Sequence, residues 1–199
     1  LEGHFDASTY SRHVAAFAPA MHKADPSITL VGVGMPAQIW DGIVAAEAGA
    51  HMDWLSAHDY FRHKGAAPVT YKDFADAPQA NTAQKLKLCR ETIDAKCPAG
   101  KKIGIAFDEW NRWHLWFANP VDHVWDVGPQ DGAFAAAMLN MLCRETHRLN
   151  IPLAALFQPV NEGAIAVAPS AAELTTLGQA YKAFRVHHGQ RAITLEDSG

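Results

Sequence analysis

The chain has 199 residues, of which 49% are hydrophobic and 19% are charged, and its net charge at pH 7 is −4. These values are typical of a globular protein that can build a real core. The sequence has no basic run, which argues against a nucleic-acid-binding protein. It also has no apolar stretch near the ~20 residues that a membrane-spanning helix needs. We therefore expect neither nucleic acid nor a membrane among the partners.

Helices and strands alternate along the predicted chain. Apolar residues recur at three- and four-residue steps from Tyr10 to Met21 and predict a helix over residues 6–24 that ends before Pro26. Apolar, β-rich runs predict strands over residues 28–33, 52–57, 102–107 and 152–157. Further helices are predicted at about residues 36–49, 82–96, 130–149 and 171–187, the first with Ile39, Ile43 and Val44 as its apolar face.

The alternation of strands and helices predicts an α/β fold with a parallel sheet. The strands are continuous apolar runs, as expected where both faces of a sheet are covered. Two connections, residues 61–81 and 112–129, are predicted to be long loops, and loops of that length are commonly functional.

The three cysteines, Cys89, Cys97 and Cys143, have no regular spacing and predict no disulfide framework. Cys89 and Cys97 are predicted on one helix, about 12 Å apart along its axis, whereas bridged Cα atoms lie within about 7 Å. Buried thiols and a reducing compartment are therefore expected.

Polar residues gather where the predicted strands end. In parallel α/β sheets, the carboxyl ends of the strands carry the ligand chemistry. Here three strands deliver acids, amides, a histidine and a tyrosine to that edge, in the segments His58-Asp59-Tyr60, Asp108-Glu109-Trp110-Asn111 and Gln158-Pro159-Val160-Asn161-Glu162.

The segment Asp108-Glu109-Trp110-Asn111-Arg112-Trp113 is the most informative of these. Its aromatic and amide residues limit the access of water and can hydrogen-bond a carboxylate or a sugar hydroxyl. That is the environment a glycosidase carboxylate needs, as nucleophile or as proton donor. We predict Glu109 as a catalytic carboxylate and Asn111 as a sugar-binding amide. Trp116 and Trp125 either stack on sugar rings or pack the loop.

At these motifs the sequence resembles glycoside hydrolase family 51, the α-L-arabinofuranosidases. The family's strand-seven signature, an apolar strand followed by Asp-Glu-Trp-Asn, is matched by residues 103–113. Its strand-six His-x-Tyr is matched by His58-Asp59-Tyr60, and its strand-eight Gln-x-Val-Asn by Gln158-Pro159-Val160-Asn161. The resemblance covers nearly the whole chain, in the family's order.

The resemblance implies a retaining glycoside hydrolase that releases terminal arabinofuranose from arabinan- or arabinoxylan-type polysaccharides. Glu109 would be the nucleophile, and Tyr60 would hydrogen-bond its carboxylate and hold it ionised and oriented. His58, Trp113 and Gln158 would line the pocket for the furanose. No cofactor is implied, and no metal is expected, because the eleven histidines lack a metal-site spacing.

Retention of configuration needs two carboxyl groups about 5 Å apart. The family's acid/base glutamate, at the end of strand four, would lie upstream of Leu1. The chain is then expected to hold strands five to eight of a (β/α)8 TIM-type barrel over residues 1–190, and the truncated start of a C-terminal β-domain over residues 191–199. Glu2 and Glu162 are possible substitutes for the proton donor within the chain. A half-barrel exposes sheet edges, so we expect an oligomer or a complementing half-barrel.

A second hypothesis also stays open: a non-catalytic carbohydrate-binding or assembly half-barrel, because no proton donor is visible in the chain. In either case the expected partner is an arabinose-containing oligo- or polysaccharide. The expected compartment is the cytoplasm, with secretion open because a targeting segment would precede Leu1.

Overall fold

The computed structural model of the chain describes residues 5–35, 39–61, 70–112, 127–160 and 163–190. The chain forms two compact units. The first consists of Leu1–Tyr60, Asn81–Trp110 and Thr146–Ala155, and the second of Phe61–Ala80, Asn111–Glu145 and Leu156–Gly199. Residues 191–199, which the sequence predicts as the start of a β-domain, lie outside the described residues.

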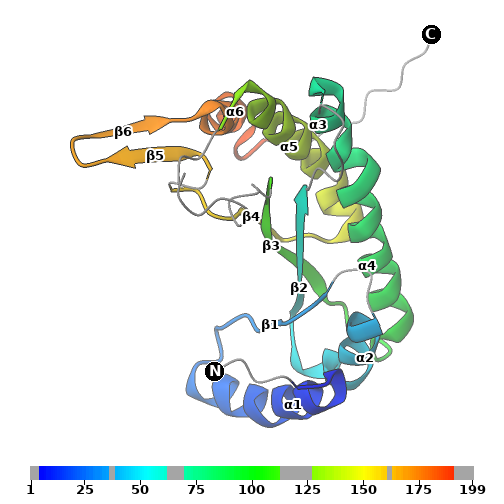
Figure 1. Cartoon of the computed structure of the whole chain (residues 1–199). Helices are drawn as coiled ribbons and strands as arrows, with labels where there is room; N and C mark the ends of the chain where they lie inside the picture. Colours follow the sequence, from blue (N-terminus) through cyan, green and yellow to red (C-terminus); the bar gives the residue numbers. More distant parts are fainter. Residues whose placement is uncertain (1–4, 36–38, 62–69, 113–126, 161–162, 191–199) are drawn as a thin grey trace. The chain divides into compact units, whose positions relative to one another are not determined.

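A four-stranded sheet has the strand order β1-β2-β3-β4 (Figure 1). Its strands are Val31–Gly32, Trp54–Phe61, Gly104–Arg112 and Leu153–Leu156. β1 pairs with β2 in parallel, with Val31 opposite Trp54, and helices separate successive strands along the chain. The protein is therefore a mixed α/β protein with a parallel sheet, as the sequence predicts.

The two inner strands, β2 and β3, are longer than predicted. They extend to Phe61 and Arg112, so the polar residues expected just beyond these strands are in fact their last residues. In β2 the alternation of buried and accessible side chains, which marks a strand, continues through Asp59. The edge strands are partly exposed, with Val31 at 43% and Leu153 at 39%. The expectation that all strands are covered on both faces is therefore wrong at the two edges.

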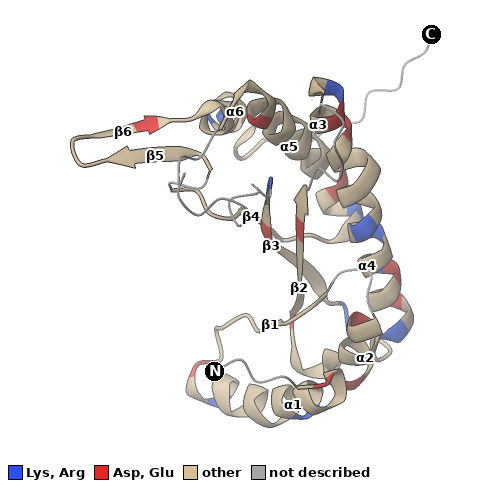
Figure 2. Ribbon diagram, in the orientation of Figure 1, with Lys and Arg blue, Asp and Glu red and all other residues tan. Residues whose placement is uncertain are grey.

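Three helices, α1 (Ala7–Ala24), α2 (Ile39–Ala48) and α4 (Ala83–Lys96), belong to the first unit, and α2 contacts both of the others. The core of this unit consists of buried apolar side chains from its helices and strands: Val44, Ala48, Leu55, Ala57, Leu86, Ile93, Ile105 and Phe107. α4 also carries the ion pairs Lys87–Glu91 and Arg90–Asp94, and its charged residues are the blue and red segments in Figure 2. Its apolar stripe therefore sets the side that packs inward.

The predicted apolar faces of α1 and α2 are only partly correct. In α1 the buried residues are Ala7, Ser11 and Ala18, which recur at helical steps, whereas Phe17 lies off that stripe and is 62% exposed. The Ser11 hydroxyl is satisfied inside the helix because it donates to the Ala7 carbonyl over 2.8 Å. Ile39 is 84% exposed because it is the first residue of α2 and precedes the buried turn.

The second unit has a core of its own, in which Leu156 and Tyr181 pack against the buried residues Ala135, Ala164 and Leu177. It contains α3 (Tyr71–Ala77), β5 (Ile165–Ala168), β6 (Ala171–Leu174), α6 (Thr176–Phe184) and most of α5 (Pro129–Leu149). Further short helical turns in the chain are Gly49–His51, Pro78–Thr82 and Arg185–His187.

The prediction of a long loop over residues 61–81 is wrong in its second half. There α3 begins at Tyr71, and Thr70 caps it: the Thr70 hydroxyl accepts a hydrogen bond from Asp73 N–H, and the Asp73 carboxylate accepts one from Thr70 N–H. This reciprocal capping box satisfies two amide groups at the helix start. The Thr-x-x-Asp pattern was visible in the sequence.

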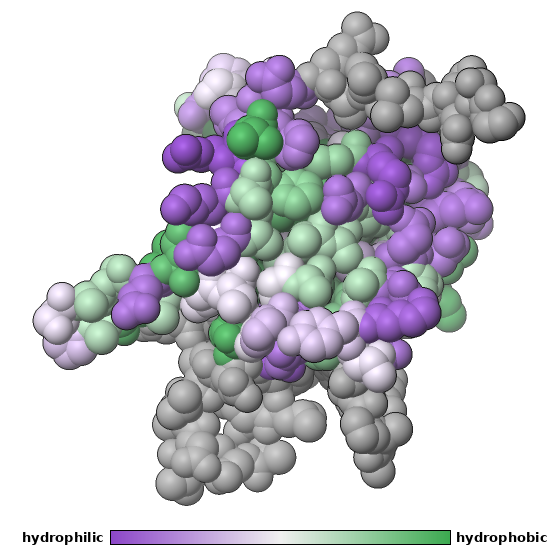
Figure 3. Space-filling model, turned by 90° about the horizontal axis from the view of Figure 1, so that it is seen from above, coloured by the Kyte–Doolittle hydropathy of each residue, from purple (hydrophilic) through white to green (hydrophobic). Residues whose placement is uncertain are grey.

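The prediction of a helix over residues 171–187 is wrong at its start. Residues 171–174 form β6, antiparallel to β5, with Ile165 opposite Leu174, and α6 begins only at Thr176. Alanine, glutamate and leucine have good helix propensity, but pairing with β5 across the turn at Pro169-Ser170 overrides it. Figure 3 shows the surface of this hairpin as mostly apolar.

The expectation of buried thiols is correct for Cys89 alone. Cys97 is half-buried and Cys143 is exposed. Cys97 is less covered because it is the C-cap residue of α4 and not part of its buried stripe.

No helix in the described ranges is both long enough and apolar enough to span a membrane. The 21-residue α5 has the necessary length, but it carries Asp131, Arg144, Glu145 and Arg148.

Candidate active site

Tyr60 and Glu109 meet near the carboxyl ends of β2 and β3. The Tyr60 hydroxyl donates a hydrogen bond to Glu109 Oε2 over 2.7 Å. Both side chains are half-buried, so the carboxylate is held by the protein and still reachable by a ligand. A hydrogen bond to an ionised carboxylate is charge-assisted and fixes its orientation. The structure thus brings together the two residues that the sequence predicts as catalytic.

Ser56, His58 and Tyr60 alternate along β2 and therefore share one side of the sheet. The Ser56 hydroxyl donates to Asp108 Oδ1 over 2.9 Å, so both acids of the Asp108-Glu109 pair bond to this row. Figure 2 marks the acidic residues of β2 and β3 in red. No sequence pattern predicts the Ser56–Asp108 contact, although the two-residue spacing of Ser56, His58 and Tyr60 indicates a shared face.

Asp59 lies between His58 and Tyr60 but has a different task. It is 8% exposed, accepts a hydrogen bond from the Thr82 hydroxyl over 2.7 Å, and pairs with Lys85. Lys85 belongs to α4, and Thr82 directly precedes it. Asp59 therefore ties α4 to β2 and faces away from the row that holds Tyr60.

A buried carboxylate, Asp41 of α2, also belongs to the surroundings of His58. Asp41 is 1% exposed and accepts the backbone N–H of Met35 over 2.6 Å. Burial raises the pKa of Asp41, against the opposing effects of the Met35 N–H, the Cys89 thiol and the charge of His58. Burial and the Asp41 carboxylate together raise the pKa of Cys89 to about 12. The Cys89 thiol is therefore protonated and unreactive.

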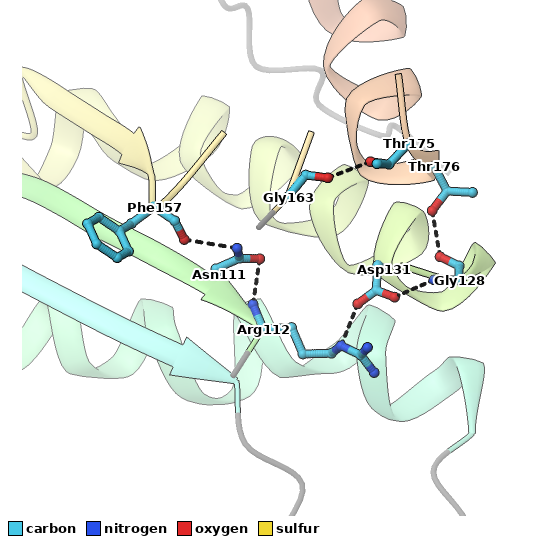
Figure 4. Close-up of polar contacts among 8 residues, drawn as sticks. All are labelled: Asn111, Arg112, Gly128, Asp131, Phe157, Gly163, Thr175 and Thr176. Carbon is cyan, nitrogen blue, oxygen red and sulfur yellow. Dashed lines mark hydrogen bonds and ion pairs between the residues drawn. The ribbon is translucent and has the colours of Figure 1, made fainter. Parts of the chain in front are cut away.

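In the second unit, Asn111 is tied to the backbone. Asn111 is 3% exposed. Its Nδ2 donates to the Phe157 carbonyl over 2.9 Å, and its Oδ1 accepts from Arg112 N–H over 2.8 Å (Figure 4). Gln158, which follows Phe157 directly, is exposed. The predicted sugar-binding Gln158 is thus one residue away from the carbonyl that Asn111 holds.

Arg112 and Asp131 form an ion pair beside Asn111 (Figure 4). Arg112 Nε lies 2.5 Å from Asp131 Oδ1, and Asp131 is 1% exposed. Asp131 Oδ2 also accepts the N–H of Gly128 over 2.8 Å. The Arg112 guanidinium lies 5.6 Å from the centre of the Phe74 ring, within the range of a cation–π contact. The end of β3 is therefore joined to the start of α5 and to α3. No sequence pattern predicts this pair.

Two known proteins with related sequences have the same activity in their names. The chain is 27% identical over 180 residues to the intracellular exo-α-(1→5)-L-arabinofuranosidase of Acetivibrio thermocellus, a match that covers 80% of the chain. It is 29% identical over 119 residues to the enzyme of the same name from Streptomyces lividans, a match that covers 57% of the chain.

Solved structures agree with this. The α-L-arabinofuranosidase of Thermotoga maritima, solved as an arabinose complex, matches 96% of the chain with a TM-score of 0.80 and 28% identity. The chain is a homologue of the family 51 α-L-arabinofuranosidases. The GH51 α-L-arabinofuranosidase of Thermotoga petrophila matches 95% of it, with a TM-score of 0.78 and 28% identity.

The homology covers only part of these arabinofuranosidases. The chain spans 35% of the A. thermocellus enzyme, 18% of the S. lividans enzyme, 38% of the T. maritima structure and 37% of the T. petrophila structure. No family model matches the chain. The predicted family resemblance is confirmed at this level, while the roles of Glu109, Tyr60, His58, Gln158 and Asn111 stay predictions.

Several predicted residues lie outside the described part of the chain. These are Trp113, expected to line the sugar pocket, the loop residues Trp116 and Trp125, and the candidate proton donors Glu2 and Glu162. Among the residues that are described, no group of three or more His, Cys, Asp or Glu side chains could hold a metal ion.

Proposed function

We propose that the protein is a retaining glycoside hydrolase of the α-L-arabinofuranosidase type, with Glu109 as its nucleophile. The observation that carries this proposal is the 2.7 Å hydrogen bond from Tyr60 to Glu109 at the ends of two adjacent strands. It occurs in a chain homologous to arabinofuranosidases. Ligand chemistry in parallel α/β folds gathers at such strand ends.

In the proposed reaction, a Glu109 carboxylate oxygen attacks the anomeric carbon of a terminal arabinofuranose while the glycosidic C–O bond breaks. The leaving oxygen takes a proton from a second carboxyl group. Water then hydrolyses the arabinosyl ester, gives its proton to that second group, and releases Glu109. Tyr60 orients the nucleophile, His58, Trp113 and Gln158 bind the sugar, and Asn111 supports the binding of the sugar.

The second carboxyl group is proposed to lie outside these 199 residues. Asp108, the acid adjacent to Glu109, is engaged with Ser56 at 2.9 Å. We propose accordingly that residues 1–190 are strands five to eight of a (β/α)8 barrel whose other strands carry the proton donor. Residues 191–199 would lead into a C-terminal β-domain. The partly exposed edges at Val31 and Leu153 support a complementing half-barrel or an oligomer.

The proposed substrate is an arabinan- or arabinoxylan-type polysaccharide or oligosaccharide with terminal arabinofuranose. The proposed compartment is the cytoplasm. The support is that the relatives from A. thermocellus and S. lividans are named intracellular exo-α-(1→5)-L-arabinofuranosidases.

The test is turnover of an aryl α-L-arabinofuranoside, because an activated leaving group needs little acid help. We expect Glu109→Gln to lower kcat by roughly 10⁴-fold or more, as loss of a nucleophile does. Glu47→Gln is the matched control, since Glu47 is an exposed glutamate of α2 in the same unit, and it should leave turnover unchanged. Equal turnover by the wild type and Glu109→Gln would contradict the proposal. Arabinose binding without any turnover would favour a non-catalytic binding module.

A further inference from the structure

The carbonyl of Phe157 is held in place from β3. Asn111 Nδ2 donates to it over 2.9 Å, and the Asn111 side chain is 3% exposed. Figure 4 shows the amide between the end of β3 and the backbone that follows β4. Because Phe157 immediately precedes Gln158, this bond restrains the backbone from which the Gln158 side chain extends.

The orientation of the Asn111 amide is fixed by the chemistry of its partners. Its oxygen accepts Arg112 N–H over 2.8 Å, so the nitrogen is the atom left to meet the Phe157 carbonyl. Arg112 is in turn anchored by Asp131, at 2.5 Å, and by the Phe74 ring. The amide therefore extends from a strand end that several contacts hold in place.

Gly163 lies close to the backbone of Gln158 and to the Asn111 amide. A Cβ atom at Gly163 would lie 2.8 Å from the Gln158 carbonyl oxygen and 3.5 Å from Asn111 Nδ2. The first distance is too short for a side chain, so only glycine lets the two backbones approach this closely. The Gly163 carbonyl accepts the Thr175 hydroxyl over 2.6 Å, which ties it to the start of α6. Gln158 thus extends from backbone held by Asn111 and by Gly163.

We propose that Asn111 and Gly163 are positioning residues that set the place of Gln158, and that Asn111 acts on the sugar through Gln158 and not by touching it. The inference rests on the proposed function, in which Gln158 binds the furanose. The sequence predicts Asn111 as a sugar-binding residue, and the proposal makes it a positioning residue instead. The reason is that the Asn111 amide is buried and bonds a backbone carbonyl, whereas Gln158 is exposed and can reach a ligand.

The test is a double-mutant cycle between Asn111→Asp and Gln158→Ala. The quantity measured in each variant is kcat/KM for an aryl α-L-arabinofuranoside. Aspartate keeps the shape and the acceptor for Arg112 N–H, but it sets an oxygen against the Phe157 carbonyl. We expect Asn111→Asp to lower kcat/KM about 10-fold in the wild-type background, mainly through KM. In the Gln158→Ala background the same change should cost less than about 2-fold, because coupled residues are not additive. Equal losses in both backgrounds would overturn the proposal.

Two further variants complete the cycle. Gly163→Ala sets a methyl group against the Gln158 carbonyl oxygen. It should lower kcat/KM in the wild-type background and have little effect in the Gln158→Ala background, and it replaces Asn111→Asp in the cycle if that variant does not fold. Asn150→Asp is the matched control, since Asn150 Nδ2 donates to the Ile103 carbonyl over 3.3 Å in the first unit. It should leave kcat/KM unchanged in both backgrounds.

A second readout does not depend on activity. Crystal structures of the wild type and of Asn111→Asp, or of Gly163→Ala, should differ at Phe157 and Gln158. If Gln158 has the same position in the wild type and the variants, the proposal is overturned, whatever the kinetic cycle shows. If the wild type neither turns over nor binds arabinose, the proposed function fails, while a displaced Gln158 still supports the positioning by Asn111.

Discussion

Two regions of the molecule hold polar side chains near the strand ends, and these side chains bond in different ways. In the first unit, Tyr60 and Glu109 are half-buried and bond side chain to side chain. In the second unit, Asn111 and Asp131 are buried and bond largely to backbone groups, the Phe157 carbonyl and the Gly128 N–H.

The difference indicates two roles: ligand binding by the side chains of the first region, and positioning of the backbone by those of the second. A half-buried carboxylate that accepts the Tyr60 hydroxyl keeps capacity for a ligand, because an ionised carboxylate accepts several hydrogen bonds. A buried side chain bonded to backbone fixes where a segment of chain runs, and losing it leaves a buried polar group unsatisfied. We therefore expect changes in the first region to reduce activity directly. Changes in the second region should mainly reduce stability, and should reduce activity only where they displace Gln158, as proposed for Asn111.

The largest stability effect is expected for Asp131→Ala. This variant removes the counter-charge of Arg112 and the acceptor of Gly128 N–H, and breaking a buried pair costs about 3–5 kcal/mol. Because Arg112 is 19% exposed, we expect about 3 kcal/mol, measured as the loss of free energy of unfolding in urea. The control is Lys72→Met, which breaks an ion pair with Asp76 at 81% exposure of the lysine and should change the free energy of unfolding far less, because exposed ion pairs contribute little. Equal losses of stability in Asp131→Ala and Lys72→Met would contradict the structural role assigned to the Arg112–Asp131 pair.

Tyr60→Phe comes next and should act on activity instead. It deletes one hydrogen bond to a carboxylate, worth about 1.5–3 kcal/mol, so kcat/KM should fall roughly 10- to 150-fold. The free energy of unfolding should change little, since Phe keeps the ring and the hydroxyl is only half-buried. Full activity in Tyr60→Phe would show that the Tyr60–Glu109 bond is structural only.

Thr70→Ala removes a helix cap in the second unit. The capping box at Thr70 and Asp73 starts α3, and loss of a threonine cap costs about 1 kcal/mol. Urea unfolding should show this loss with kcat unchanged. A fall in kcat at a temperature where the variant is fully folded would contradict the purely structural role of this cap.

The smallest effect, Asp41→Asn, depends on pH. Burial raises the folded-state pKa of Asp41 above its ordinary value of 3.8. Its contribution to stability is therefore complete below the unfolded pKa and is lost as the pH rises through the folded pKa. Asparagine mimics the neutral form and still accepts Met35 N–H. Asp41→Asn should thus be more stable than wild type near pH 7, with the difference shrinking toward about pH 4.

Asp6 provides the opposite control for that pH series. Hydrogen bonds from Thr9 lower the pKa of Asp6, so its contribution is present above the unfolded pKa and is lost as the pH falls. Asp6→Asn should lose stability near neutral pH and approach wild type in acid. The same pH slope in both variants would contradict the assigned signs.

The sequence was sufficient to predict the strand-end residues because two simple rules coincide there. Side chains two apart on a strand share a face, which groups Ser56, His58 and Tyr60, and parallel strands carry ligand chemistry at their carboxyl ends. The Tyr60–Glu109 contact then joins motifs 49 residues apart that the family resemblance had already paired.

The rest depended on contacts that no local pattern carries. The hairpin of β5 and β6 was missed because residues 171–174 favour a helix by propensity and become a strand only by pairing with β5. The Asn111–Phe157 bond joins residues 46 apart and ends on a backbone carbonyl. Every residue has such a carbonyl, so no residue type in the sequence predicts this bond. The sequence therefore predicts a sugar ligand at Asn111, where we propose a positioning residue.

The most direct measurement is covalent trapping with a mechanism-based arabinofuranosyl inhibitor, followed by peptide mass spectrometry. A retaining enzyme forms a covalent glycosyl ester on its nucleophile. We predict a single modification on Glu109, absent from Glu109→Gln and retained in Glu47→Gln. Modification of another carboxylate with Glu109 untouched, or no modification of a protein that turns over the aryl substrate, would contradict the assignment of Glu109.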